Sequence, residues 1–370
     1  MSEKQNDLFT IGIIALMLLA FSVTDVLAHA GLLHGDFETG ATAPVYTSKS
    51  LMNGTYFEEV EAYVTADFYN VTRWSRLVQK AELLMGKRDW NDVLLGKRDT
   101  FFEKHLTREY EGAKVQESLA YLKNLTENHH ARVMLIPTAD EIWSDRLPLY
   151  ADAFDQKAYL DQVREIVGEE HYLDLYAVLA EHANEAIYYR TDPHWTSLAA
   201  YYAYYAWWKA SGKLLPYYYD MRNATVVTES FVGPLAKAAG LEAKGEEILV
   251  FEETEGKSVS VIYDDYYVAD GYYRPEHLDS DNALGYFLGE RFGAATIQTG
   301  KKSKPELVVF GDENSHLLIP LLAPHYSKIF IVHLDQFQGN PKALLERRRD
   351  AEVLVVQSVP NWLDLFEQKE

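Results

Sequence analysis

The chain has 370 residues, of which 48% are hydrophobic, so it is long enough to bury one large core or two ordinary ones. It carries 56 acidic against 35 basic residues, and the resulting charge of −21 opposes binding to nucleic acid and to anionic lipid surfaces. The absence of cysteine excludes disulfides, thiolate catalysis and zinc–thiolate sites.

An apolar run lies close to the N-terminus. Residues 8–23 read LFTIGIIALMLLAFSV, which is short for a bilayer-spanning helix, since such a helix needs about 20 apolar residues. The triplet AHA at 28–30 fits the small-x-small pattern that signal peptidase cleaves. We therefore expect residues 1–30 to be a signal anchor or a signal peptide, with the anchor favoured, and residues 31–50 to be a polar connector. This predicts an extracytoplasmic protein, held in the cell membrane by an N-terminal helix, or secreted if that helix is cleaved.

Helix and strand patterns alternate from there on. Apolar residues recur at spacings of three and four between 57 and 84, which predicts helix. The run RVMLIPT at 132–138 is almost continuously apolar, as in a strand buried on both faces of a parallel sheet. The other elements expected up to residue 210 are strands over 93–97 and 186–190, helices over 109–128, 155–168 and 196–210, and a strand or short helix over 173–179.

The last third repeats a strand–helix rhythm, with strands expected over 307–310, 328–334 and 353–359 and helices over 315–322 and 341–348. Strand–helix alternation at this spacing implies right-handed crossovers and a parallel sheet, so the expected fold class is α/β. Residues 217–290 are rich in tyrosine. Two strands expected there, 247–251 and 259–263, have the pattern of antiparallel strands in an inserted β region outside the parallel core.

The segment YYRTDPHWT, residues 188–196, lies between a short expected strand and a helix for which Thr196 is a suitable N-cap. Asp192 and His194 are two residues apart, so both side chains can face one cleft. A carboxylate beside an imidazole fixes its tautomer and raises its basicity, as general base catalysis requires. The alternative is that both residues only stabilise the loop before the helix.

A second motif, GDENSH at 311–316, follows a buried strand and opens a helix. Catalytic groups favour such strand ends in open α/β sheets. The backbone N–H groups of Gly311, Asp312 and Asn314 at the helix start are candidates for an oxyanion hole. The alternative is a tight strand-to-helix turn without a chemical role.

Other short segments accompany the two motifs: NGTY at 53–56, GKRD at 96–99, SDRLP at 144–148, YFLG at 286–289 and IPLL at 319–322. Taken together, the chain resembles the DHHW family, an SGNH-hydrolase-like group related to the proteins of alginate O-acetylation. The resemblance implies a flavodoxin-like SGNH domain over residues 51–370, with 217–290 as an insertion. It also implies substrate-binding roles for Trp195, Arg190 and Tyr189. The middle histidine of the family signature is replaced by Pro193.

The chain departs from the family at the nucleophile, because Glu313 follows Asp312 where the family has serine, and Ser315 comes two residues later. Three outcomes stay open. The site is inactive or only binds a ligand, or a remodelled loop makes Ser315 the nucleophile, with His194 as the base and Asp192 as its orienting group. The third outcome is other chemistry, such as that of a glycosidase with a second carboxylate opposite Glu313. Two carboxylates flanking His194 would favour the imidazolium, which cannot act as a base.

The resemblance implies a cell-envelope protein that takes part in O-acylation, such as acetylation, or in deacylation of a surface polysaccharide. A membrane-bound O-acyltransferase is the expected protein partner, and the N-terminal segment is the expected contact with the membrane. The alternative is a non-catalytic module on the same fold that binds the glycan or docks the acyltransferase. Whether the chain is an enzyme stays open, and we expect no cofactor, no metal and no nucleic-acid partner.

Overall fold

The computed structural model describes residues 19–20, 22–24, 26–28, 30, 32, 44–52, 55–66, 71–212, 224–251, 259–290 and 292–367. Within these residues, no helix combines the length and the apolar character needed to cross a membrane. Most of the apolar run at 8–23 lies outside the described residues, so the anchor over 1–30 stays a prediction. The tyrosines at 217–219 also lie outside them.

The chain divides into two compact units, Met1–Lys87 and Arg88–Glu370. The first unit contains α2 (Ser48–Met52), α3 (Thr55–Ala66) and α4 (Val71–Leu84), so the helical pattern between 57 and 84 belongs to two helices. Thr47 caps α2, because its Oγ1 accepts a hydrogen bond from the backbone N of Ser50 at 3.0 Å.

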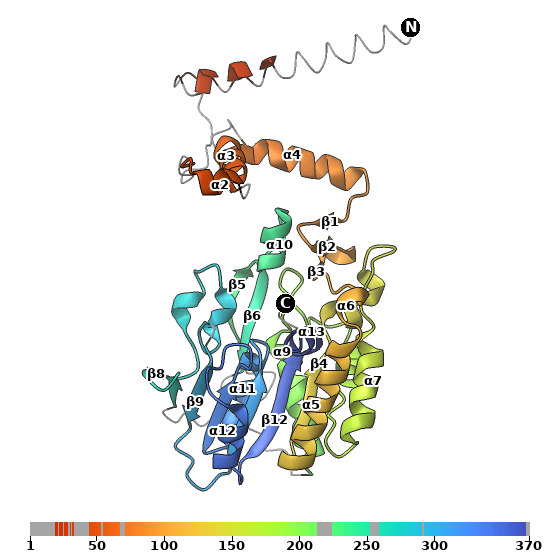
Figure 1. Ribbon diagram of the computed structural model, residues 1–370, viewed down its shortest axis with the longest axis vertical. Coiled ribbons are helices and arrows are strands. Elements are labelled where there is room, and N and C mark those ends of the chain that lie inside the picture. Colours follow the sequence, from red (N-terminus) through yellow and green to blue (C-terminus); the bar gives the residue numbers. More distant parts are fainter. Residues whose placement is uncertain are drawn as a thin grey trace. The chain divides into compact units, whose positions relative to one another are not determined.

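A twisted seven-stranded sheet forms the centre of the second unit (Figure 1). Its parallel half consists, in spatial order, of β4 (Arg132–Ile136), β12 (Glu352–Ser358), β10 (Glu306–Gly311) and β11 (Lys328–Val332). Its antiparallel half continues with β9 (Ala294–Gln298), β7 (Ser260–Tyr263) and β8 (Tyr267–Asp270). The prediction of an α/β fold is confirmed, but the sheet is mixed rather than wholly parallel, since β9, β7 and β8 pair antiparallel.

Both faces of the parallel half are buried, and this explains why its strands are continuously apolar. In β10, Leu307 and Val309 pack into one core cluster and Val308 and Phe310 into the other, and none of the four is more than 1% exposed. Burying each such side chain stabilises the fold by about 1.5–3 kcal/mol before entropy is counted.

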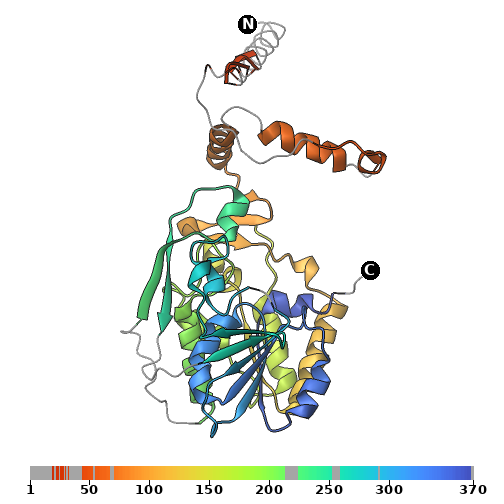
Figure 2. The same ribbon diagram turned by 90° about the vertical axis from the view of Figure 1, so that its left-hand side faces the viewer.

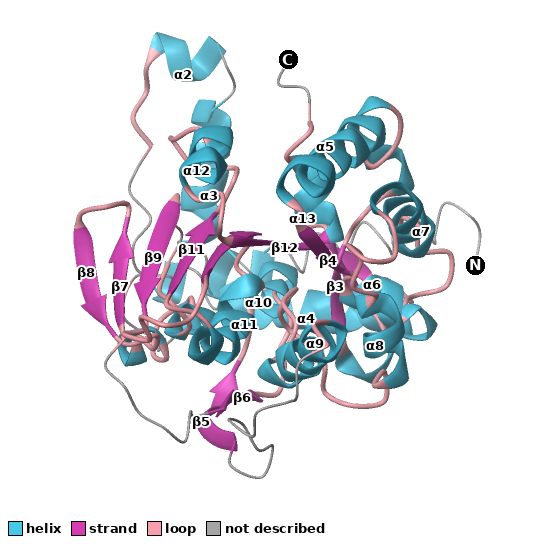
Figure 3. Cartoon of the chain, turned by 90° about the horizontal axis from the view of Figure 1, so that it is seen from below, coloured by secondary structure: helices cyan, strands magenta, loops and turns pink. Residues whose placement is uncertain are grey.

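Helices cover both faces of the sheet (Figure 3). One face carries α5 (Ala113–His129), α7 (Gln156–Val167), α12 (Pro341–Arg347) and α13 (Val359–Asp364). The other carries α8 (Leu175–Glu181), α9 (Ser197–Ala210) and α11 (Ser315–Leu322). This layered arrangement is what alternating strands and helices require.

Smaller elements complete the unit: the antiparallel strands β1 (Asp89–Trp90), β2 (Val93–Leu95) and β3 (Phe101–Glu103), the short helices α6 (Ala139–Ile142) and α10 (Pro234–Ala239), and the hairpin of β5 (Ala224–Phe231) and β6 (Glu246–Phe251). The hairpin is a sheet of its own beside the layered core (Figure 2).

Two expectations about elements were wrong. The strand at 259–263 does not pair with the one at 247–251, since β6 pairs with β5 and β7 joins the main sheet through β9. Residues 186–190 form no strand, only an isolated bridge between Tyr188 and Trp195. Of the two alternatives for 173–179, the short helix is confirmed: α8 begins at Leu175, because Asp174 caps it through the backbone N of Ala177 at 3.0 Å. In the first case the partner of a short strand is chosen by long-range packing, which local patterns do not record.

The parallel strands define where a site can form. Their register aligns the carboxyl ends of β4, β12 and β10, so the residues that follow them gather along one edge of the sheet. Thr138 follows β4, Asp312 follows β10 and Ser358 ends β12. Ligands of open α/β sheets bind outside this kind of edge.

Candidate functional site

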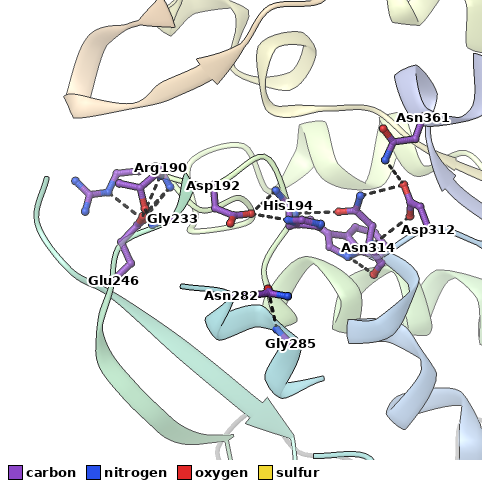
Figure 4. A network of polar contacts seen from close by, with 12 residues as sticks. Arg190, Asp192, His194, Gly233, Glu246, Asn282, Gly285, Asp312, Asn314 and Asn361 are labelled. Carbon is purple, nitrogen blue, oxygen red and sulfur yellow. Dashed lines mark hydrogen bonds and ion pairs between the residues drawn. The ribbon is translucent and has the colours of Figure 1, made fainter. Parts of the chain in front are cut away.

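The loop before α9 holds Asp192 and His194 together (Figure 4). Asp192 Oδ1 accepts from His194 Nδ1 at 2.6 Å and from the His194 backbone N at 2.9 Å. The loop ends where predicted, at Thr196, whose Oγ1 accepts from the backbone N of Ala199 and donates to the carbonyl of Ala186. Sequence reasoning therefore placed the carboxylate–imidazole pair correctly on one loop.

The carboxylates around His194 favour the charged form of its ring. Burial of the ring opposes its charge, but the Asp192 carboxylate, and then those of Asp312 and Glu313, raise the pKa of His194 to about 9. An imidazolium donates hydrogen bonds and takes up no proton, so this histidine is a donor rather than a base near pH 7.

The Asp312 carboxylate is a structural centre for the second motif. It accepts from the backbone N of Ser358 at 2.9 Å, the Asn361 Nδ2 at 2.9 Å, and the backbone N and Nδ2 of Asn314 at 3.1 and 3.2 Å. Because the Asn314 N–H donates to Asp312, it is engaged and is not pointed at a ligand oxygen as an oxyanion hole requires. Gly311 is needed here, because a Cβ at its position would lie 2.5 Å from Ser315 Oγ.

Ser315 does not replace the missing nucleophile in this geometry. Its side chain is fully buried, and its Oγ donates to the backbone carbonyl of Asp312 at 2.7 Å. Glu313 instead lines the pocket together with His194. The helix start turns Ser315 inward because residues two apart on a helix point in different directions.

Trp195 and Asn314 join the two motifs. The Trp195 Nε1 donates to the Asn314 carbonyl at 2.8 Å, and the Trp195 backbone N donates to Asn314 Oδ1 at 3.3 Å. Trp195 is fully buried and Tyr189 is only 2% exposed, so the expectation that these two side chains contact a substrate was wrong. Both belong to the core that supports the loop.

Arg190 is likewise engaged within the protein, through a residue that the sequence did not point out. The Glu246 carboxylate accepts from the backbone N and Nε of Arg190 and from the backbone N and Oγ1 of Thr191, at 2.8 to 3.2 Å. Thr191 Oγ1 then accepts from the backbone N of Gly233 at 2.9 Å. A Cβ on Gly233 would collide with the Thr191 carbonyl, so glycine is required for this close approach (Figure 4).

A pocket of about 1250 Å³ runs along the carboxyl edge of the sheet. It is lined by His194, Glu313, Asn282 and Glu290, and by a second set of residues: Glu103, His105, Thr138, Gln357 and Asp364. The second set was not predicted, because no local motif surrounds these residues. In the described part of the chain, no group of three or more His, Asp or Glu side chains is arranged to hold a metal.

Comparison with known proteins agrees with the resemblance drawn from the sequence. Residues 105–265 match the DHHW protein family model. No curated protein matches the chain. A DHHW family protein from Eubacterium siraeum has 19% identity and a TM-score of 0.61, covering 76% of this chain and 94% of that one.

Bacillus cereus PatB1, solved with a sulfonyl adduct, has 16% identity and a TM-score of 0.62, covering 75% of this chain and 98% of that one. The O-acetyltransferase domain of Pseudomonas putida AlgJ has 14% identity and a TM-score of 0.45, covering 75% and 93%, which is too loose a likeness to bear on this site. At these identities the first two structures establish a shared fold.

Proposed function

We propose that this protein, whose residues 105–265 match the DHHW family model, works in O-acylation of a surface polysaccharide as a glycan-binding module that does not itself transfer the acyl group. One observation carries the proposal. The serine that follows the expected nucleophile position most closely in the chain, Ser315, is fully buried with its hydroxyl donated to the Asp312 carbonyl, while Glu313 occupies the pocket wall.

Glu313 is chemically unsuited to the family reaction. A carboxylate that attacks an ester forms a mixed anhydride, which lies higher in energy than the ester itself. Its negative charge adds to the larger effects of Asp192 and Asp312, which together raise the pKa of His194 and disfavour its neutral, proton-accepting form. Acyl transfer through a serine ester is therefore disfavoured at two points.

The same groups suit a polyol. A carboxylate at Glu313 accepts from sugar hydroxyls, the His194 imidazolium donates to them, and charge-assisted hydrogen bonds of this kind are about twice as strong as neutral ones. The pocket is large enough for an oligosaccharide segment, since ligand sites commonly measure about 300–1,000 Å³. The pocket thus offers binding groups without a reactive hydroxyl.

The experiment compares acetyl-ester hydrolysis by the full chain with that of Glu313→Ser and Glu313→Ala. We expect background turnover from the parent and from Glu313→Ala, and a gain only in Glu313→Ser. This change supplies a hydroxyl and removes one of the negative charges that raise the pKa of His194. Adding His194→Ala to Glu313→Ser should abolish the gain. Turnover by the parent that disappears in Ser315→Ala would refute the binding role and restore Ser315 as a nucleophile.

The place of action belongs to the same proposal. The apolar run at 8–23 and the AHA triplet at 28–30 support a location outside the cytoplasm, and a membrane-bound O-acyltransferase is the proposed partner. Fractionation of cells that express the full chain or a chain lacking residues 1–30 tests this. Membrane association of the full chain alone supports the anchor, and equal distribution of both chains in the cytoplasm rejects it.

A further inference from the structure

The part of the pocket lined by the second set of residues has features of a binding site in its own right. Glu103 at the end of β3, Thr138 after β4, Gln357 in β12 and Asp364 in α13 line it, and His105 lies among them. These residues come from three separate parts of the chain: 103–105, 138 and 357–364. None of them belongs to the short motifs from which the sequence resemblance was drawn, although His105 and Thr138 lie within the residues 105–265 that match the family model.

His105 is held as a buried, charged donor. It is 6% exposed, and its Nδ1 lies 3.1 Å from Asp140 Oδ2. Burial opposes its charge, but the carboxylates of Asp140 and then Glu103 raise the pKa of His105 to about 10. Asp140 is itself fixed, because Thr138 Oγ1 donates to its Oδ1 at 2.5 Å and Gln156 Nε2 donates to that hydroxyl at 2.5 Å.

This network repeats the arrangement around His194. In both places a buried Asp binds the Nδ1 side of an imidazolium, and a glutamate with access to the pocket contributes to its charge: Asp192 and Glu313 for His194, Asp140 and Glu103 for His105. A buried ion pair costs desolvation free energy that apolar side chains would avoid. A second such pair at the wall of the same pocket is therefore an argument for a binding role.

Glu103 and Asp364 make this part of the pocket acidic. The Glu103 side chain is 55% exposed, and its Oε2 lies 3.6 Å from His105 Nε2, beyond hydrogen-bond distance. Burial and then the charges of Asp364 and Glu103 raise the pKa of the Tyr110 hydroxyl. Both carboxylates therefore lie close to this hydroxyl. Lys114 pairs with Asp364 at 2.9 Å, so Glu103 is the better placed of the two to receive a ligand cation.

Gln357 supplies the independent sign of a missing ligand. It is 4% exposed, it lines the pocket, and its Oε1 has no hydrogen-bond donor within the described structure. Buried acceptors of this kind are nearly always satisfied in native proteins. A donor brought in by a ligand would complete this one.

We propose that Glu103, His105 and Gln357 form a second subsite of the pocket and bind an amino-sugar residue of the glycan. The ammonium group of the sugar pairs with Glu103, a sugar hydroxyl or N–H donates to Gln357, and a sugar oxygen accepts from His105. This inference rests on the proposed function, since it assumes that a glycan occupies the part near His194.

Charge gives the subsite its selectivity. Seven carboxylates line the pocket among its described residues, those of Glu103, Glu290, Asp312, Glu313, Asp335, Asp364 and Glu367. Both imidazolium charges are already balanced by the buried Asp192 and Asp140. A uronic acid would add a further carboxylate to this wall, whereas a glucosamine unit would add a cation. The pocket therefore selects amino sugars and rejects polyuronates.

The test is calorimetric titration of the full chain with three oligosaccharides of four sugar units: glucosamine, N-acetylglucosamine and galacturonic acid. At about pH 6 the amines and both histidines are charged. We expect the glucosamine oligomer to bind about fivefold tighter than its acetylated form, the size of one partly exposed ion pair, and the uronate not to bind. Equal or tighter binding of the uronate would overturn the proposal.

Variants separate this subsite from the rest of the pocket. Glu103→Gln should abolish the preference for glucosamine, and the same change at Glu117, which is exposed on α5 and does not line the pocket, should preserve it. Gln357→Leu should weaken both amino-sugar oligomers without lowering Tm, because it removes an unpaired acceptor. If the oligomers bind but Glu103→Gln keeps the preference, the subsite is wrong and glycan binding stands. If no oligomer binds, the proposed function fails too.

Discussion

The indole Nε1 of Trp195 donates to the backbone carbonyl of Asn314 at 2.8 Å, although the two residues are 119 positions apart in the chain. This bond ties the loop that carries His194 to the turn that carries Glu313. The two halves of the site are thus held at a fixed separation by a side chain that never reaches the pocket.

Replacing Trp195 by Phe should loosen this connection. The ring would still fill most of the core site, but the Asn314 carbonyl would lose its donor, so we expect the free energy of unfolding to fall by about 1–3 kcal/mol. Urea denaturation measures this change. Oligosaccharide affinity should fall as well, since the His194 loop would no longer be fixed against Glu313. An unchanged affinity would mean that the loops hold their positions by other contacts.

Glu246 provides a second test of loop positioning, and its neighbour provides the control. Glu246→Gln keeps the size of the side chain but removes the charge that receives four donors from Arg190 and Thr191, so we expect a loss of about 2–3 kcal/mol in stability and weaker glycan binding. Glu247 is exposed on the same strand, and Glu247→Gln should change neither property. Equal effects of both changes in denaturation and calorimetry would contradict this role.

The charge on His194 can be followed directly by NMR. The ring should titrate with a pKa of about 9, and Asp192→Asn should move the pKa down, because burial then acts with less opposition. The folded pKa lies above the ordinary value of 6.5, so the stability that this pair contributes is complete below about pH 6.5 and is lost as the pH rises through 9. A ring that titrates near 6.5 in the parent would reject the imidazolium assignment.

Ser315→Ala separates a structural serine from a catalytic one. Losing the bond to the Asp312 carbonyl should lower the free energy of unfolding by about 1 kcal/mol, with no effect on oligosaccharide affinity. In the Glu313→Ser background, the gained esterase activity should survive the change. Loss of that activity at unchanged stability would show that Ser315 takes part in the reaction.

The sequence was most informative where chemistry is local. The pair Asp192–His194, the cap at Thr196 and the helix over 315–322 follow from neighbouring residues, and the structure has all three. The inward orientation of the Ser315 side chain became visible only in the structure, because a sequence motif gives the order of residues but not the direction in which their side chains point.

Contacts between distant segments were beyond local patterns. Glu246 contacts Arg190 at a sequence separation of 56 residues, and Asp140 contacts His105 at a separation of 35. No local sequence pattern predicts either contact. The reversed strand β9 was missed for the same reason, since a short apolar run pairs equally well in either direction. Trp195 and Tyr189 were expected to contact a substrate, but both are buried in the core. Aromatic side chains are common in cores as well as in ligand-binding surfaces, so the sequence does not distinguish the two roles.

The position of β12 between β4 and β10 has a consequence for assembly. The strand made last inserts between two strands made earlier, and the segment around it supplies the Ser358 and Asn361 donors to Asp312. Until residues 352–361 have left the ribosome, β4 has no neighbour on that side and Asp312 lacks two of its donors. A chain truncated before residue 352 would therefore lose the centre of the site rather than its edge.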